Sequence, residues 1–239
     1  MAGEPDDSSG RGRTHASPAR SDIDQIKVFL NASLAPLVGA LLPIDRHTQH
    51  RGAADIVEGR IAEKLLADVR EQSFGEAVPA RSKRSIEDFL LKRAGRNWHI
   101  DVKSRDIDGD FSMPNLVSIA RLRKLYGCSA NHLLFVVVSY RTCGSHVEIV
   151  GVEFHAIEEI SWTSLAIQNL GLGQIQIRNA KLALAPYAGT RDDWVREFFQ
   201  EAASFYDHLA AKAARAASEW RRSASFLEMG DHPLPDTLP

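Results

Sequence analysis

The chain has 239 residues, of which 44% are hydrophobic and 25% charged, enough for a sizeable core in one large domain or two small ones. Its 29 lysines and arginines and 31 aspartates and glutamates leave a net charge of −2, so it has no bulk positive charge with which to bind nucleic acid. Cys128 and Cys143 have neither metal-site nor disulfide spacing, which predicts reduced thiols in a cytoplasmic protein.

The two ends of the chain are predicted to lie outside the folded part. Residues 1–20 contain no apolar segment of the kind that a signal peptide needs, and they predict a disordered tail. Residues 225–239 predict a loose C-terminal tail. The part between them, residues 21–224, is expected to form a single domain.

Two helices are predicted before any strand. The first begins at Ser21 or Asp22 and runs to about Leu42, with a bend or break near Pro36; its apolar half is too short and too interrupted for a membrane span. The second covers residues 53–71. Its apolar face consists of Val57, Ile61, Ala62, Leu65, Leu66 and Val69.

The remaining elements alternate between strand and helix patterns. Strands are predicted at residues 85–91, 98–104, 132–141 and 146–157. A shorter strand is predicted within residues 171–184, after the two glycines that open this stretch. One helix is predicted to begin after Pro114 and to end before Gly127, and another covers residues 192–222. The last helix carries an aromatic stripe that is expected to join the core: Trp194, Phe198, Phe199, Phe205 and Tyr206. This order predicts an α/β (α+β) fold with a mixed sheet between helical layers.

The stretch SIEDFLLKRAGRNWHIDVKSRDIDGDF, residues 85–111, places carboxylates on a predicted hairpin. With a loop over residues 92–97, the symmetric register puts Asp88 opposite Asp101, with Cβ atoms about 5 Å apart. Lys103 shares the face of Asp101 because side chains alternate along a strand. Basic residues surround the hairpin: Arg81, Lys83, Arg84, Lys92, Arg93, Arg96, Lys103 and Arg105.

Two opposed carboxylates repel each other unless a cation lies between them. Mg²⁺ prefers oxygen ligands and often uses one or two carboxylates together with a substrate phosphate, so the pattern suits phosphodiester hydrolysis. Lys103 could orient or deprotonate a water or stabilise charge, and a bound cation would lower its pKa. The alternative is that Asp-x-Lys arose by chance on a solvated strand face.

At these residues the chain resembles the PD-(D/E)xK nuclease superfamily and, within it, the type II restriction endonucleases. The family pattern is an acid at the start of one strand and an acid-x-Lys on the next; here these are Asp88 in SIEDFLL and Asp101-Val102-Lys103 in HIDVKS. The residue before Asp88 is Glu87, where the family pattern has proline. The stretches DFSMPNLVSIARL and SLAIQNLGLGQIQIRN also look familiar for restriction enzymes, and the resemblance covers residues 53–179.

The resemblance implies a restriction-endonuclease-like core and a Mg²⁺-dependent enzyme, with Mn²⁺ able to replace Mg²⁺, that cuts double-stranded DNA. A homodimer acting on a palindromic site, and a cognate DNA methyltransferase that protects the host, would accompany it. By the family's pattern Asp88, Asp101 and the backbone carbonyl of Val102 would bind the metal, and Lys103 would position the water. Many members add a glutamate from the preceding helix; helical phase favours Glu58 over Glu63, since Glu58 falls on the apolar face.

Candidate DNA contacts follow the same residues along the chain. Gln174, Gln176 and Arg178 share a strand face by period two, with Asn179 next, and glutamine, asparagine and arginine pair with base edges in the major groove. An amphipathic edge strand is the alternative. Further candidates for contacts to backbone or bases are Ser104, Arg105 and Asn115. Contacts to phosphates are expected from Arg81, Lys83 and Arg84.

Three other functions stay open at this point. A DNA repair or recombination nuclease of the same superfamily would use the same three catalytic residues and read DNA shape. A non-catalytic DNA-binding protein would use the acids structurally. An unrelated globular protein would carry a chance Asp-x-Lys. The cluster Asp106, Asp108 and Asp110 gives an incomplete calcium-loop series and predicts a solvated loop.

Overall fold

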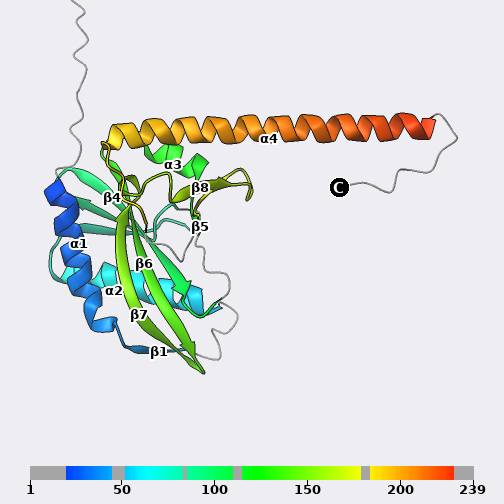
Figure 1. Cartoon of the computed structure of the whole chain (residues 1–239). Helices are drawn as coiled ribbons and strands as arrows, with labels where there is room; N and C mark the ends of the chain where they lie inside the picture. Colours follow the sequence, from blue (N-terminus) through cyan, green and yellow to red (C-terminus); the bar gives the residue numbers. More distant parts are fainter. Residues whose placement is uncertain (1–19, 45–51, 83–84, 110–114, 179–183, 229–239) are drawn as a thin grey trace, which may run out of the picture.

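The computed structural model describes residues 20–44, 52–82, 85–109, 115–178 and 184–228 (Figure 1). A larger sheet has the strand order β1-β7-β6-β4-β3-β2, and a smaller sheet has the order β5-β9-β8. The strands of the larger sheet are β1 Leu41–Pro43, β2 Glu76–Pro79, β3 Phe89–Arg93, β4 Arg96–Asp106, β6 Asn131–Cys143 and β7 His146–Ala156. Those of the smaller sheet are β5 Asn115–Ser118, β8 Leu165–Gln168 and β9 Gln174–Ile177.

Among the described residues, the α-helices that accompany the sheets are α1 Arg20–Leu34, α2 Gly52–Glu71, α3 Ile119–Leu125 and α4 Arg191–Glu228. The short 3-10 helices described are η1 Ala35–Leu37 and η3 Ile157–Glu159. In the described part of the chain no helix is both long and apolar enough to cross a membrane. The predicted α+β class with a mixed sheet flanked by helices is confirmed, because β4 pairs in parallel with β6 while the other neighbours in the larger sheet are antiparallel.

The central strand β6 separates two hydrophobic clusters. Its residues 132–140 are buried, as expected for a strand covered on both faces. Leu134, Val136 and Val138 pack with α1 and α2 in the first cluster. Leu133, Phe135 and Val137, which point the other way, pack with α3, the smaller sheet and the start of α4 in the second. The candidate site lies on the face of the second cluster.

The first predicted helix is wrong beyond Leu34. The chain passes through η1 at Pro36, whose ring cannot continue a helix, and then Leu41–Pro43 pair with the edge of β7. Gly39 makes the turn between them with a φ of 84°. The second predicted helix is confirmed as α2, and its buried residues Val57, Ile61, Leu65 and Val69 belong to the predicted apolar face.

The hairpin of β3 and β4 is confirmed with a tighter turn than predicted. The strands continue to Arg93 and Arg96, so only Ala94 and Gly95 form the turn. Their φ values of 50° and 72° are those that a two-residue hairpin turn requires. Shortening the loop at both ends by the same amount preserves the predicted register.

The helix predicted from Pro114 is wrong in its first part. Asn115–Ser118 form β5, which pairs with β9, and only Ile119–Leu125 are helical. The Ser118 hydroxyl caps α3 by accepting a hydrogen bond from the backbone N–H of Arg121 at 3.3 Å. The smaller sheet, and with it β8, was not predicted, because these strands are four residues long and their pairing is decided by distant segments.

The final helix is longer than predicted. α4 reaches Glu228, whereas a loose tail was expected from residue 225. Trp194 and Phe198 are buried in the second cluster as expected, but Phe199 and Tyr206 are exposed. The stripe therefore contributes to the core over its first turns only.

Replacing Gly173 tests how the smaller sheet is held against α3. A Cβ there would lie 2.7 Å from the Ile119 side chain, and the φ of 103° strains any other residue, so Gly173→Ala is expected to lower the free energy of unfolding by about 2–4 kcal/mol. Gly171→Ala is the matched control, because its φ is 60° and no atom lies within 4 Å of a Cβ; it should cost about 1 kcal/mol. Urea denaturation measures both, and equal losses would contradict close packing at Gly173.

Candidate active site

The hairpin brings Asp88 and Asp101 to the same place. β3 begins at Phe89, which is paired with Ile100, and the backbone N–H of Asp88, the residue before it, donates to the Ile100 carbonyl at 2.9 Å. Continuing this register by one residue sets Asp88 across from Asp101, as the sequence predicted. Beyond Ile100 the described strands leave this edge of β4 unpaired, while the other edge pairs with β6 as far as Asp106.

Two carboxylates close the unpaired edge of β4. The Oδ2 atom of Asp88 accepts a hydrogen bond from the Val102 backbone N–H at 2.7 Å. Two residues further on, the Oε1 atom of Glu58 accepts from both the backbone N–H and the hydroxyl of Ser104, each at 2.9 Å. Asp88 comes from the end of the preceding loop and Glu58 from α2, so three elements meet at this edge. Of the two candidate glutamates, Glu58 contacts β4 and Glu63 is exposed.

Asp101 is the most deeply buried of these acids. Its residue is 6% exposed, and its Oδ1 atom accepts from Lys103 Nζ at 2.9 Å. Burial raises the pKa of Asp101 to about 7; Lys103 lowers it in part, and the charges of Asp88 and Glu58 raise it further. The ion pair with Lys103 therefore does not offset the cost of burying this carboxylate among other acids.

The other ionisable groups of the site shift in the same sense. Burial raises the pKa of Asp88, against the effect of the Val102 N–H and Lys103, and it raises the pKa of Glu58 against the hydrogen bonds from Ser104. Burial alone would lower the pKa of Lys103, but the three carboxylates outweigh it, so the pKa of Lys103 is raised. The lowered pKa expected for Lys103 referred to a site with a bound cation, whereas these shifts are those of the protein alone.

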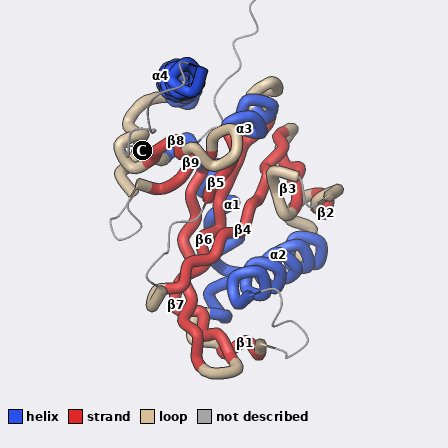
Figure 2. Tube along the Cα trace, turned by 90° about the vertical axis from the view of Figure 1, so that its right-hand side faces the viewer, coloured by secondary structure: helices blue, strands red, loops and turns tan. Residues whose placement is uncertain are grey.

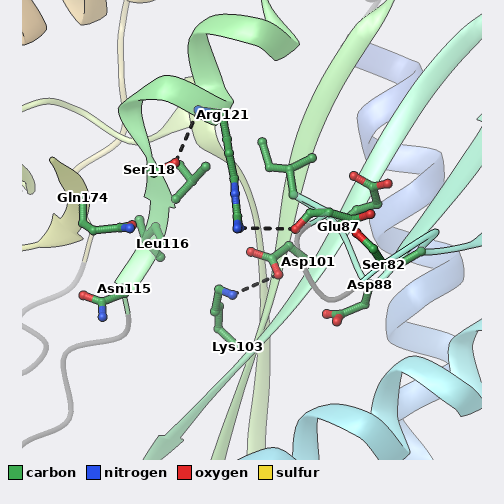
Figure 3. Close-up of a pocket in the computed structure, with 14 residues that line it drawn as sticks. Ser82, Glu87, Asp88, Asp101, Lys103, Asn115, Leu116, Ser118, Arg121 and Gln174 are labelled. Carbon is green, nitrogen blue, oxygen red and sulfur yellow. Dashed lines mark hydrogen bonds and ion pairs between the residues drawn. The ribbon is translucent and has the colours of Figure 1, made fainter. Parts of the chain in front are cut away.

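A cavity of about 580 Å³ opens beside these side chains (Figure 3). It lies between β4 and the loop before β3 on one side and β5, α3 and β9 on the other. The polar side chains that line it are Ser82, Ser85, Glu87, Asp88, Asp101, Lys103, Asn115, Ser118, Arg121 and Gln174. It is therefore a polar cleft with Asp88 and Asp101 on one side and the smaller sheet on the opposite side.

Arg121 is a cleft residue that sequence reasoning missed. Its side chain extends from α3 toward the acids, and its guanidinium donates to the Ser85 carbonyl at 3.3 Å (Figure 3). IARLRKL contains three basic residues, and no sequence pattern distinguishes the one that faces the cleft, since that depends on the contact between α3 and the larger sheet.

Glu87 and His99 form a second polar pair next to the acids. The His99 Nδ1 atom lies 2.9 Å from Glu87 Oε2, and His99 shares the strand face of Asp101. Glu87 itself lines the cleft. Glu87 therefore contacts β4 through His99, which gives it a local structural role.

The donor set fits a hard divalent cation with few protein ligands. Within the described ranges, no group of three histidine, cysteine, aspartate or glutamate side chains forms a metal site by itself. Asp88 and Asp101 nevertheless both supply carboxylate oxygens to the cleft, and burial raises the pKa of each. The Val102 carbonyl is directed to the same edge as its N–H, which Asp88 binds.

The candidate DNA-reading strand is placed differently from the prediction. Ile175 and Ile177 are buried as expected, but Gln176 is also buried, with its side-chain N–H donating to the Asn115 side-chain oxygen. Gln174 and Asn115 line the cleft. The prediction that Gln176 joins an outward polar face is wrong, because β9 is the middle strand of its sheet and Gln176 pairs with Asn115 on β5.

The remaining predicted contacts have partners within the chain or lie outside the description. Ser104 donates to Glu58, and Arg105 donates to Ser139 Oγ at 2.9 Å and to Glu153. Arg178 is exposed, and its side chain donates to the Leu165 carbonyl. Arg81 is exposed. The predictions for Lys83, Arg84, Asp110 and Asn179 fall outside the described residues.

Comparisons with known proteins find similarity to solved structures. No family model matches the chain, and no curated protein matches it. Among solved structures it is similar to the NlaIV restriction endonuclease, with 13% sequence identity over 89% of this chain and 92% of that chain and a TM-score of 0.49. At this TM-score the similarity carries no functional argument, so the functional argument uses the side chains of the cleft.

Replacing Asp101 by asparagine is expected to stabilise the protein at high pH. The pKa of Asp101 is about 7 in the folded chain and near 3.8 when unfolded, so the wild type loses stability as the pH rises between these values. Asp101→Asn should therefore raise the free energy of unfolding at pH 8 by about 1–4 kcal/mol and leave it nearly unchanged below about pH 4.

Urea denaturation at the two pH values measures this difference. The control is Asp108→Asn, which removes an exposed carboxylate paired with Arg141 and should change stability by less than about 1 kcal/mol at either pH. A loss of stability in Asp101→Asn at pH 8 would mean that the ion pair with Lys103 outweighs the cost of burial.

Proposed function

We propose that this protein is a Mg²⁺-dependent nuclease that hydrolyses phosphodiester bonds of double-stranded DNA, and that it acts at specific sites as a type II restriction endonuclease. The observation that carries the proposal is the convergence of Asp88, Asp101 and Lys103 at the unpaired edge of β4, on the floor of a polar cleft. Three carboxylates with raised pKa values at one place are costly for a fold that has no use for them.

The proposal assigns a role to each group. Asp88, Asp101 and the Val102 carbonyl would hold Mg²⁺, which when bound neutralises charge on a phosphodiester and activates water. Lys103, an ammonium held by Asp101, would orient a water or a phosphate oxygen in the cleft. Glu58 holds β4 by accepting two hydrogen bonds from Ser104, and its negative charge would act on the same water or cation.

The wall opposite the acids is proposed to meet the DNA. Asn115 and Gln174 present amide groups to the cleft, and such groups can pair with adenine in the major groove. Arg121 places a positive charge beside the acids, where it would offset their repulsion of a phosphate. Gln176 would act indirectly, since it holds Asn115 in place.

Cleavage of a long, defined duplex DNA tests the proposal directly. With Mg²⁺ the wild type should give discrete fragments, and without it none. Asp101→Ala and Lys103→Ala should each lower the rate by at least about 100-fold, because each removes a group proposed to act at the scissile phosphate. The rate is measured as loss of intact duplex with time on DNA in several methylation states.

Asp108→Ala serves as the control, since Asp108 is an exposed acid paired with Arg141 and does not line the cleft. It should cut at the wild-type rate and at the same sites. A Mg²⁺-dependent smear, or cutting confined to branched DNA, would replace site-specific restriction with a repair or recombination nuclease. Absence of cleavage on all substrates would refute the nuclease proposal.

Binding of Mg²⁺ can be measured without activity. Saturating Mg²⁺ should raise the free energy of unfolding by about 1–3 kcal/mol at pH 8.5 and by less at pH 6, since the ion must displace the proton that Asp101 holds near neutral pH. Thermal denaturation with and without Mg²⁺ gives the shift in melting temperature. Asp101→Asn should abolish the shift and Asp108→Asn should retain it; an equal shift in both would place the ion elsewhere.

A further inference from the structure

Helix α4 extends well beyond the body of the protein (Figure 1). It has 38 residues and is therefore about 57 Å long. Its first turns contact η3 and β8, and Trp194 and Phe198 are buried in the second cluster. From residue 210 to residue 225 almost every residue is exposed, and we call residues 210–228, the end of α4, the arm. Figure 2, which looks along α4, shows it at the margin of the fold above β8.

The face of α4 that packs on the core continues along the arm. At 100° per residue, Trp194, Phe198 and Phe205 lie on one side of the helix, and Leu209, Ala213, Ala216 and Trp220 continue it within an arc of about 100°. Trp220 is 68% exposed, and both alanines are exposed. An apolar stripe that begins in the core therefore ends on a surface that no described residue covers.

More apolar surface lies at the base of the arm. Leu170 and Leu172, in the turn between β8 and β9, are 47% and 74% exposed. The carbonyl of Leu172 accepts from the hydroxyl of Tyr206, which fixes this turn against α4 just before the arm begins. A single exposed leucine or tryptophan is ordinary, but a connected set along one helix face marks a site of interaction.

We propose that the arm binds the arm of a second copy of this chain, in an antiparallel, two-fold pair of helices. A helix gains most of its stability from packing its apolar face, so an arm of about 19 residues calls for a partner. The partner must present an equally narrow apolar surface, because alanine is the commonest residue in the stripe of the arm. A second arm that runs antiparallel to the first presents such a surface.

Side-chain size supports this pairing. If the two-fold axis passes between Ala216 and Ala217, residues whose numbers add to 433 lie at the same level. The large Trp220 then faces the partner's Ala213, and Leu209 faces the partner's Ala224. Small residues, Ala216 and the partner's Ala217, meet at the axis, where two helix backbones can approach closely. Each large side chain therefore has a small one across from it.

Charge supports the same register. Lys212 and Glu219 lie on one flank of the stripe, and a two-fold axis perpendicular to the helix pair brings the same flanks of both arms together. Lys212 then lies within about one helical turn of the partner's Glu219, and the symmetry repeats the pair. No acid faces an acid across the stripe in this arrangement.

A nucleic-acid duplex is the other occupant to consider. The arm carries four basic residues, Lys212, Arg215, Arg221 and Arg222, which flank the stripe from different sides. Besides the Trp220 indole, the stripe has the Ser223 hydroxyl, which already donates to the Glu219 carbonyl at 3.1 Å. Burying Trp220 against a duplex would leave the indole facing a charged surface. An apolar face with paired charges beside it suits a second protein helix better.

Dimerisation through the arm is independent of the nuclease proposal but would serve it. Two clefts related by a two-fold axis could each address one strand of a palindromic duplex. Since the arm is remote in sequence from Asp88, Asp101 and Lys103, either inference can fail alone. Asp101→Ala, which removes the proposed catalysis, should remain dimeric.

Sedimentation velocity of the full chain, without DNA or metal, tests the proposal. The wild type is expected to be a dimer. Ala213→Glu is expected to be monomeric at the same concentration, with a dissociation constant of the dimer at least about tenfold higher, because the substitution places a charge in the stripe. Ala211→Glu is the matched control: it makes the same change on the opposite face and should remain a dimer. Far-UV circular dichroism confirms that both variants keep their helical content.

A cross-link tests the register. Ala216→Cys, in a chain whose exposed Cys128 and Cys143 are replaced by serine, should form a covalent dimer on mild oxidation, whereas Ala211→Cys should not. A wild type that stays monomeric at its highest soluble concentration would overturn the proposal. Equal effects of Ala213→Glu and Ala211→Glu on dimerisation would overturn it as well. If the protein is a monomer and both Ala213→Glu and Arg215→Ala weaken its binding to duplex DNA, the arm binds nucleic acid instead.

Discussion

The candidate site depends on one constraint, the edge of β4 that β3 leaves unpaired beyond Ile100. Buried backbone N–H groups need acceptors, and an orphan donor costs about 1–3 kcal/mol. Asp88 accepts from the Val102 N–H and Glu58 accepts from the Ser104 N–H, and Asp88 also lines the cleft together with Asp101. Hydrogen bonding to the backbone fixes the positions of Asp88 and Glu58 before any ligand is present, and this preorganisation is what a charged substrate or cation would use.

The same arrangement explains why the site is costly to the fold. Asp88, Asp101 and Glu58 are held close together and partly or wholly buried, and their pKa values rise because burial outweighs the hydrogen bonds and Lys103. A fold selected for stability alone would place neutral residues here. The proposed cation would lower this cost, since a divalent charge offsets the repulsion among the acids.

Two layers of the molecule give the cleft its shape and its surroundings. The larger sheet supplies the acids from one face, and the smaller sheet with α3 supplies Asn115, Gln174 and Arg121 from across the cavity. α4 packs on the same second cluster and then continues outward as the arm. The element that supports the wall of the cleft is thus also the one proposed to join two copies, which would couple the geometry of one site to that of the other.

The sequence by itself determined the local features: α2 with Glu58 on its inner side, the β3–β4 hairpin and its register, the buried strand β6, and its alternating neighbour β7. Each follows from a period of 3.6 or 2 within one segment, and local alternation suffices to set Asp101 and Lys103 on one face. Only the tertiary structure decided the smaller sheet, the burial of Gln176, the cleft position of Arg121 and the extension of α4 into an exposed arm. These depend on contacts between segments far apart in the chain, and a strand of four residues or a single arginine carries no pattern from which such contacts can be read.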